Sequence, residues 1–388
     1  MTPVTIIFLT VFIDLIGFGI VIPLMPFYAE RFGASGLMIG LLGTSFSLMQ
    51  FLFAPFWGRL SDRIGRRPVI LIGLFGSFLS YLLFGLAGSL PVLFFARICA
   101  GVAGANIATA QAYMADVTTP ENRARGMGLV GAAFGLGFIF GPAIGGFLSQ
   151  FSHQAPPFFA SALSIINFTA AWFILPESRT ERSDRPRLSR LESLRQAVTR
   201  PGLPQLLLIY FMVTAAFSSF ETTFPLFGER RFGFTPTNIG YVFAYSGVML
   251  TIIQGGLVGR LAKRFGENRL MPPAILCLAA GLGLLPAAYG LPMLLVATSL
   301  MAIGMGFNNP SITALISRLS RADEQGGILG VSQSVASLAR IVGPAAGGLV
   351  YDRMGFTMPY LVAAGIIAVA FLISLTNLKP LQAGELPR

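Results

Sequence analysis

The chain has 388 residues, of which 54% are hydrophobic and only 11% are charged. A soluble domain averages about 25% charged residues, so this composition excludes an ordinary soluble domain and indicates a membrane protein. The net charge of +11 would suit a nucleic-acid partner, but the basic residues lie in short loops between apolar runs. Basic residues in such loops set the orientation of membrane spans, and we therefore expect no nucleic-acid partner.

Apolar stretches recur along the whole chain. A membrane-spanning helix needs roughly 20 apolar residues, and twelve stretches meet that requirement. The first lacks both a basic segment before it and a small-residue cleavage site, so we expect a retained helix rather than a signal peptide. The predicted spans cover residues 4–25, 37–57, 69–88, 91–115, 124–150, 156–176, 204–227, 235–258, 271–289, 291–317, 326–350 and 356–377.

The basic residues lie mainly on one side of these spans. Alternate loops and the chain ends on one side hold 21 of the 27 Lys and Arg residues, and the opposite side holds four. Because the loops of a membrane protein that carry most Lys and Arg face the cytoplasm, both chain ends are predicted to be cytoplasmic.

Two landmarks repeat at almost the same offset. The loop "WGRLSDRIGRRPVI" (57–70) is matched by "VGRLAKRFGENRLM" (258–271), with Gly58 and Gly259 separated by 201 positions. The segment "GFIFGPAIGGFLS" is matched by "ARIVGPAAGGLVY", with Gly141 and Gly343 separated by 202 positions. The repeat predicts two related six-helix bundles, residues 1–176 and 204–388, joined by a polar cytoplasmic linker, 177–203. Parallel repeats around a central site are a transporter architecture.

Four charged residues lie well inside the predicted spans: Asp14, Arg97, Glu221 and Arg340. A charge at membrane depth is costly and is usually paired or functional. A carboxyl group in a low-dielectric cavity can take up a proton on one side and release it on the other, and a cationic substrate can compete for the same group. We expect Asp14 and Glu221 to respond to protons and cations, with Arg97 and Arg340 as counter-charges. The alternative is that each acid pairs with an arginine and only holds helices together.

Other residues within the spans could line a substrate path. Phenylalanines at helical spacing around Glu221 could stack a flat cation, and polar side chains could contact it. The candidates are Gln50, Asn106, Gln111, Tyr113, Asn167, Phe217, Phe220, Phe224, Gln254, Asn308, Asn309 and Gln333. The two cysteines, Cys99 and Cys277, lie in different spans, and His153 is the single histidine. These residues predict neither a disulfide nor a metal site.

Several motifs resemble the major facilitator superfamily over the whole chain. "GRLSDRIGRRP" is similar to the family's loop 2–3 signature, and "ARICAGVAGANIATAQAYMAD" is similar to its span 4 motif. "GAAFGLGFIFGPAIGGF" is similar to its span 5 antiporter motif, "FIDLIGFGIVIPLMP" to tetracycline–proton antiporters and "SSFETTFPLF" to multidrug pumps. The resemblance implies an all-α membrane protein of twelve helices in two pseudo-symmetric bundles.

The resemblance also implies a function. We expect a secondary transporter in a bacterial inner membrane that exports small amphipathic molecules in exchange for protons and needs no cofactor. A monomer is expected because the site lies within one chain. The functional acids and His of tetracycline pumps have no counterpart at Ser80, Leu250 or Ala280, and the multidrug pumps' span 10 acid falls at Asn308. The substrate is therefore not fixed by the sequence.

The basic loop and the span 5 glycines are expected to serve conformational change. In the loop, Gly58 would allow a close helix approach, and Asp62 would face the positive end of span 11 near Gly326 and Gly327. Arg66 or Arg67 would reach Asp116. In span 5, Gly137, Gly141 and Gly145 form one face beside Pro142. That face could seal the interface between the two halves or only pack helices.

Other function classes are less well supported. The chain has no phosphate-loop motif, no G-x-S-x-G and no H-E-x-x-H, so an enzyme or an ATP-driven pump is not expected. A channel would need a ring of filter residues in an oligomer. The alternative that remains is an uptake symporter or facilitator for a sugar, an amino acid or an organic anion.

Overall fold

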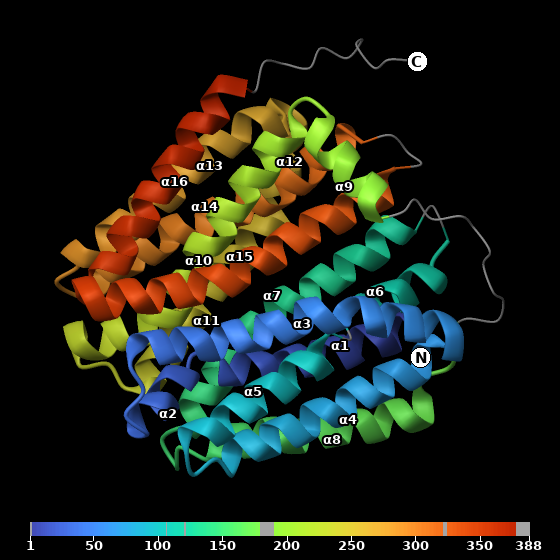
Figure 1. The fold of residues 1–388 in the computed structure, drawn as a ribbon, viewed down its shortest axis with the longest axis horizontal. Coiled ribbons are helices and arrows are strands. Elements are labelled where there is room, and N and C mark those ends of the chain that lie inside the picture. Colours follow the sequence, from blue (N-terminus) through green and yellow to red (C-terminus); the bar gives the residue numbers. More distant parts are fainter. Residues whose placement is uncertain (1, 106, 120–121, 179–189, 321–323, 378–388) are drawn as a thin grey trace. The chain divides into compact units, whose positions relative to one another are not determined.

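The computed structural model describes residues 2–377 except 106, 120–121, 179–189 and 321–323 (Figure 1). Within that part the protein is helical and has no strand. Twelve helical segments are long and apolar enough to cross a membrane, which confirms the predicted all-α membrane fold. The helices are α1 (Pro3–Val21), α2 (Met25–Arg31), α3 (Gly36–Ile64), α4 (Arg66–Gly85), α5 (Leu90–Gly104), α6 (Ile107–Asp116), α7 (Arg123–Leu148), α8 (Ala155–Ile174), α9 (Arg190–Thr199), α10 (Leu203–Phe232), α11 (Pro236–Ile252), α12 (Val258–Phe265), α13 (Glu267–Leu284), α14 (Leu291–Arg318), α15 (Gln325–Met354) and α16 (Met358–Asn377).

Two spans contain irregularities that the hydropathy pattern does not reveal. The first span breaks between α1 and α2, where Pro23 supplies no amide hydrogen for a continuous helix. In the fourth span, α5 and α6 are described on either side of residue 106, which lies outside the described residues. The eighth span passes through a π-helical turn, Ile253–Leu257, between α11 and α12. The predicted polar linker contains helix α9, which its composition does not indicate.

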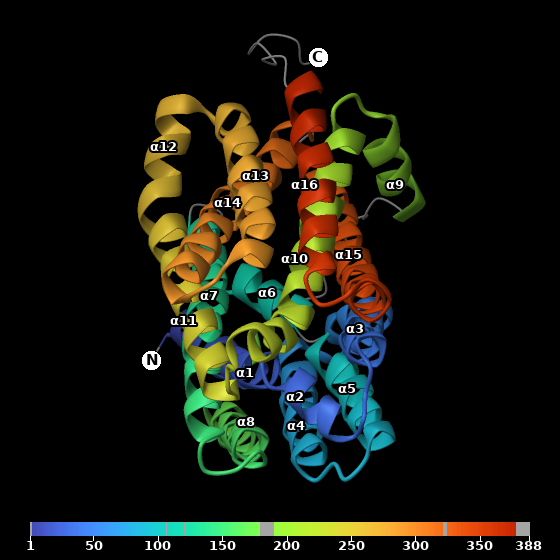
Figure 2. The same ribbon diagram turned by 90° about the vertical axis from the view of Figure 1, so that its left-hand side faces the viewer.

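The chain forms two compact units. The first contains Met1–Asp184, Glu221–Val248 and Pro344–Phe356, and the second contains Arg185–Phe220, Met249–Gly343 and Thr357–Arg388. In the first unit, α1 packs against α7 and α8, while α4 packs against α5 and α8. In the second, α13 packs between α14 and α16 (Figure 2).

Glycine contacts bring α1 and α7 together in the first unit. A Cβ atom on Gly19 would lie 2.6 Å from the carbonyl oxygen of Gly137, and a Cβ on Gly141 would lie 2.6 Å from the Cα of Gly19. Helices in lipid gain little from the hydrophobic effect and depend on close van der Waals packing, which small residues permit. The backbone contact therefore fixes the position of α1.

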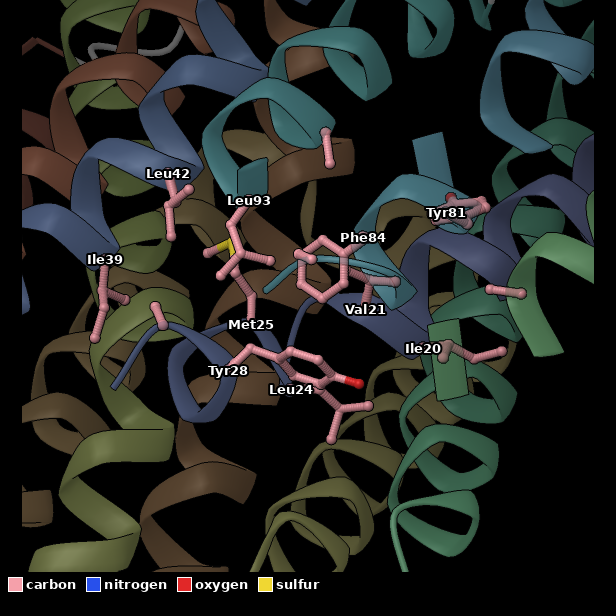
Figure 3. Packing of buried hydrophobic residues seen from close by; sticks show 14 of the residues in the cluster. Ile20, Val21, Leu24, Met25, Tyr28, Ile39, Leu42, Tyr81, Phe84 and Leu93 are labelled. Atoms are coloured by element: carbon pink, nitrogen blue, oxygen red, sulfur yellow. The ribbon is translucent and has the colours of Figure 1, made fainter. Parts of the chain in front are cut away.

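A cluster of buried apolar side chains fills one end of the first unit. It includes Ile20, Leu24 and Tyr28 from α1, α2 and their connection, and Ile39, Phe84 and Leu93 from α3, α4 and α5 (Figure 3). Leu226 and Tyr351 belong to the same cluster, so segments of α10 and α15 pack with the first six spans. At this end, a Cβ on Gly36 would lie 2.8 Å from the Tyr351 ring. Close packing at this end thus joins α3 to α15.

The contact between α1 and α7 gives a stability prediction. Gly141→Ala should lower the free energy of unfolding by about 1–3 kcal/mol, because the added methyl group would overlap the backbone at Gly19. Gly131→Ala on the same helix is the matched control, since no heavy atom lies within 4 Å of a Cβ placed there. Alanine there should be neutral or stabilising by up to about 1 kcal/mol. Thermal unfolding in detergent measures both, and equal midpoints for the two variants would contradict the close contact.

Candidate functional site

Asp14 lies on α1 inside the first unit. Its residue surface is only partly buried, but its Oδ1 atom is buried and has no hydrogen-bond partner. Two polar side chains of α4, Ser77 and Tyr81, lie within electrostatic range of the carboxyl group. Gly17 makes room for this arrangement, because a Cβ there would lie 3.0 Å from the Tyr81 ring. The span 1 acid therefore faces a polar edge of α4.

Arg97 lies on α5, and its side chain is 4% exposed. Its guanidinium group lies 4.4 Å from the centre of the Phe46 ring on α3, a cation–π contact. Tyr81 lies within electrostatic range of both Arg97 and Asp14. No ion pair within 4.0 Å joins Asp14 to Arg97 among the described residues, and the Arg97 Nε atom has no hydrogen-bond partner. The alternative in which this acid and this arginine lock two helices by direct pairing is not what the structure contains.

Aromatic side chains that the sequence pattern does not single out surround this region. The Phe18 ring of α1 lies 5.2 Å from the Phe46 ring and 6.3 Å from the Phe138 ring of α7. Phe18 lies one helical turn beyond Asp14, a spacing that would have placed the two on the same side of α1. Phe46 and Phe138 have no comparable sequence signal, because they come close only through the packing of three helices. The result is a carboxyl group, an arginine and three aromatic rings in one unit.

The corresponding charges of the second half lie on α10 and α15. Glu221 is partly buried on α10 between Phe220 and Thr222. Arg340 donates a hydrogen bond to Ser337 Oγ at 3.2 Å, one turn earlier on α15, and lies within electrostatic range of Tyr210. The serine contact is local to α15, so it does not by itself join two helices.

The three candidate phenylalanines on α10 differ in their surroundings. Phe224 is fully buried against Phe243 and Phe227, with ring centres 5.5 and 6.3 Å away. In this structure Phe224 packs against protein rings, and its role in stacking a ligand stays a prediction. Phe220 is also buried, between Phe217 and Tyr360. Phe217 keeps part of its surface exposed and remains a candidate for contact with a flat molecule.

Several of the polar candidates hold helices together instead of lining an open path. Asn167 Nδ2 donates to the carbonyl oxygen of Thr10 at 2.9 Å, and Tyr113 Oη donates to that of Pro176 at 2.9 Å. Both residues are buried in this structure, and their role as cavity residues stays a prediction. Gln50 Nε2 donates to the carbonyl oxygen of Gly104 at 3.1 Å and is partly exposed.

The other polar candidates divide between exposed and unpartnered groups. Gln111, Gln254 and Gln333 are exposed, and Asn106 lies outside the described residues. Asn308 on α14 is 0% exposed, and neither of its side-chain amide atoms has a hydrogen-bond partner. Asn309 Oδ1 is likewise buried and unpartnered. An unpaired buried amide costs free energy, so this part of α14 is suited to contact water or a ligand.

The basic loop forms a connected set of polar contacts around Arg66. The Arg66 guanidinium contacts Asp62 at 2.8 Å, Asp116 at 3.1 Å and Ser61 Oγ at 2.6 Å. The arginine side chain is almost completely buried, so its charge needs these partners. Of the two arginines predicted to reach Asp116, the structure places Arg66 there. Arg67 instead donates to the backbone carbonyl oxygen of Trp172.

Glu177 is a member of this set that was expected only to belong to the linker. Its carboxylate accepts hydrogen bonds from the backbone N–H groups of Arg66 at 2.8 Å and Arg67 at 3.2 Å, at the start of α4. A carboxylate at a helix N-terminus satisfies free amide groups and interacts favourably with the helix dipole. Gly65 has φ +101° and leaves no room for a Cβ beside Glu177. Hydrogen bonds to Glu177 thus connect the basic loop to the segment that follows the sixth span.

Gly58 does not have the close neighbour that its place in the motif predicts. Among the described residues, no heavy atom lies within 4 Å of a Cβ placed on it. The tight glycine of this loop is Gly65, whose positive φ and contact with Glu177 exclude a side chain.

The span 5 glycine motif packs within the first six spans. A Cβ on Gly137 would lie 2.8 Å from Leu15, and one on Gly145 would lie 2.8 Å from the carbonyl oxygen of Ile20. The neighbouring face of α7 contacts α11 instead. There Gly240 approaches the carbonyl oxygen of Pro142, and a Cβ on Gly247 would lie 3.0 Å from that of Phe138. The contact with α11 is therefore made beside the predicted glycine face rather than by it.

The loop contacts lead to a prediction about Arg66. Arg66→Lys keeps the charge but removes the planar group that reaches Asp62 and Asp116 together, so both thermal stability and transport turnover should fall. Arg63→Lys, at an exposed position three residues away, is the matched control and should leave both unchanged. Unfolding midpoints and transport rates in vesicles measure the effect. Equal behaviour of the two variants would show that Arg66 acts only as a topogenic charge.

Comparisons with known proteins agree with this architecture. The Major Facilitator Superfamily model matches residues 7–289 and 232–387. Multidrug resistance protein 2 of Bacillus subtilis (strain 168) is 34% identical over 369 residues, which is 92% of this chain and 91% of that protein. The class E tetracycline resistance protein of Escherichia coli is 34% identical over 375 residues, or 94% and 92% of the two chains.

Solved structures of transporters have a similar fold. The human organic anion transporter MFSD10 (TETRAN) is 27% identical, with a TM-score of 0.72 over 96% of this chain and 98% of that one. The nucleoside transporter NupG (D323A mutant) is 14% identical, with a TM-score of 0.82 over 97% and 100%, a likeness of fold alone. The family match and the relatives confirm a transporter rather than an enzyme. The chain belongs to the Major Facilitator Superfamily.

Proposed function

We propose that this transporter is a proton-coupled antiporter that exports amphipathic, preferentially cationic small molecules. The observation that carries the proposal is the Asp14 carboxyl group, which has a buried, unpartnered oxygen and no arginine within ion-pair distance among the described residues. An ionised carboxylate at membrane depth needs a counter-charge, whereas a protonated one does not. The group can therefore bind either a proton or the positive charge of a substrate.

Exchange follows from this competition. A cationic substrate that reaches Asp14 replaces the proton, and a proton from the other side releases the substrate. Glu221 supplies a second carboxyl group in the other half of the chain, on the repeat-equivalent span. Conformational change that exposes the carboxyl groups to one side at a time would then couple the two movements.

The neighbourhood of Asp14 supports an aromatic, amphipathic substrate. The Phe18 ring contacts both Phe46 and Phe138, and flat cations are attracted to aromatic faces. Relatives carry names that refer to multidrug and tetracycline resistance, which agrees with this substrate class. We further propose that the protein works as a monomer in a bacterial inner membrane. The charge distribution favours cytoplasmic chain ends.

The competing function is uptake of a small metabolite by symport or facilitated diffusion. It would need no exchange between substrate and proton at one carboxyl group. The resistance-related names of the relatives favour export.

Reconstituted vesicles test the proposed exchange. Proteoliposomes with an acidic lumen and a pH-sensitive dye should lose their pH gradient when some lipophilic cations, quinolones or tetracycline are added. Asp14→Asn and Glu221→Gln should abolish this response, because neither amide can carry the proton. Glu267→Gln, which alters a carboxylate paired with Arg318 at 2.9 Å, is the control and should keep it. No response to any compound in the wild-type protein would contradict export of this class and favour uptake.

A stability measurement separates a transport role for Asp14 from a structural lock. Breaking a buried ion pair costs about 3–5 kcal/mol because it leaves an uncompensated charge, and among the described residues Asp14 has no ion-pair partner whose charge would be left behind. Asp14→Asn should therefore keep the wild-type unfolding midpoint while transport is lost. A large drop in the midpoint would instead assign Asp14 to holding helices together.

A further inference from the structure

A short motif of the basic loop has a second copy at the end of α15. Residues 62–65 read "DRIG", and residues 352–355 read "DRMG". In both copies the aspartate lies two residues before the last residue of its helix. The glycine that follows the helix has a positive φ in both, +101° at Gly65 and +100° at Gly355. The two helix ends are therefore built alike, although they lie on opposite sides of the predicted spans.

The aspartate of the second copy holds the first turn of α3. Asp352 Oδ1 accepts a hydrogen bond from the backbone N–H of Gly36, and Oδ2 accepts one from that of Leu37, both at 2.8 Å. The next amide, that of Met38, donates to Ser35 Oγ at 3.3 Å. Free amides at the start of a helix need partners, and a carboxylate there also interacts favourably with the helix dipole. Two of these three amides are thus satisfied by a carboxylate from another helix.

Small residues let the two helices approach closely beside this contact. A Cβ atom on Gly348 would overlap the carbonyl oxygen of Gly36, and one on Gly40 would overlap that of Pro344. These positions recur every four residues on both helices, so each set lies along one face. Backbone contact of this kind requires small residues. Asp352 continues the row on α15 and supplies its polar contact with α3.

The charge of Asp352 has no other strong partner nearby. Among the described residues no Lys or Arg lies within 4.0 Å of its carboxylate. The adjacent Arg230 guanidinium lies instead 5.1 Å from the centre of the Tyr351 ring. Asp352 is exposed, so water can replace the two amides when the helices part. The contact is therefore suited to be made and broken repeatedly.

We propose that Asp352 is a latch: its two hydrogen bonds keep this end of the transporter closed and break when this end opens. The sequence predicts the corresponding role for Asp62, whose expected partner is the start of α15 at the other end of α3. Each helix would then carry, near its own end, the carboxylate that engages the start of the other. Helix α3 is about 40 Å long, so the two latches act on opposite sides of the membrane. Engagement of one latch at a time lets one end open while the other is closed.

This inference does not depend on proton exchange at Asp14 or on the identity of the substrate. It concerns only which end of the transporter is open when no substrate is present. A distance measurement without substrate and without a pH gradient therefore tests the latch alone. If the proposed antiport fails, the effect of Asp352 on opening is still expected.

Spin-label distances in nanodiscs give the test. Cys99 and Cys277 are first replaced by serine, so that only introduced cysteines carry labels. Labels at Gln154 and Met354 report on the end that Asp352 is proposed to close, because both positions are exposed and lie on the side opposite the basic loop. The protein without further changes should show mainly the short distance there.

Loss of the carboxylate should shift this equilibrium. Asp352→Asn removes the charge and one of the two acceptor oxygens, so the population with the longer distance should increase about twofold or more. A second label pair, at the exposed Ile64 and Lys263, reports on the other end. That distance should become shorter in the same variant, because opening of one end accompanies closure of the other. Lengthening at the Asp352 end alone would mean that the end of α15 only frays, and would overturn the inference.

Two further variants make the test decisive. Leu37→Pro removes a donor of the same contact from the side of α3, at a position in the first helical turn where proline is tolerated. It should behave as Asp352→Asn does and replaces that variant if it fails to fold. Arg353→Gln changes the charge of the exposed neighbouring residue and is the matched control, which should keep both distances. Unchanged distances in Asp352→Asn and Leu37→Pro, or an equal shift in Arg353→Gln, would show that Asp352 is no latch.

Discussion

The free-energy cost of placing charges and unpaired polar groups in lipid determines how the polar side chains of this protein are arranged. The chain keeps few charged side chains within its spans, and each has a particular setting. Arg97 lies against an aromatic ring, Arg66 against two carboxylates, and Asp14 beside Ser77 and Tyr81. Free amides at helix starts obey the same constraint, which is why Glu177 lies at the start of α4 and Asp352 at the start of α3.

Acidic side chains serve different purposes in the same chain. Asp14 has an unpartnered oxygen, whereas Glu177 and Asp352 accept hydrogen bonds from the free amides at helix starts. The difference lies in what surrounds each carboxyl group rather than in the residue type. Among these acids, the proposed exchange of a cation concerns Asp14.

The fold was largely predictable from the sequence because its strongest signal is length and apolarity. Twelve spans follow from those properties, and repeated landmarks such as Gly58 and Gly259 indicate the internal repeat. The break before α2 and the π-helical turn after Ile252 were not predicted, because they depend on single backbone groups within uniformly apolar runs. The division into residues 1–176 and 204–388 remains a prediction from the sequence.

The candidate site was less predictable, since it depends on which side of each helix a residue faces. Asp14 and Arg97 were identifiable as charges in apolar runs, and the link between Arg66 and Asp116 was among the expected contacts. Tyr113, Asn167 and Gln50 all donate to backbone carbonyls of other segments, but Tyr113 and Asn167 are buried whereas Gln50 is partly exposed. Phe46 and Phe138 became recognisable only through the packing of α3, α1 and α7. The sequence carries the identity of such residues but not their orientation.

Helix α7 presents smooth backbone surfaces on two adjacent sides. One side, with Gly137, Gly141 and Gly145, lies against α1, and the other, with Phe138, Pro142 and Gly146, lies against α11. The α11 residues of the second contact, Gly240 and Gly247, belong to the same compact unit as α7, so both sides of the helix are used within one unit. Because backbone atoms have no rotamers to fix, both contacts form with little loss of side-chain conformational entropy.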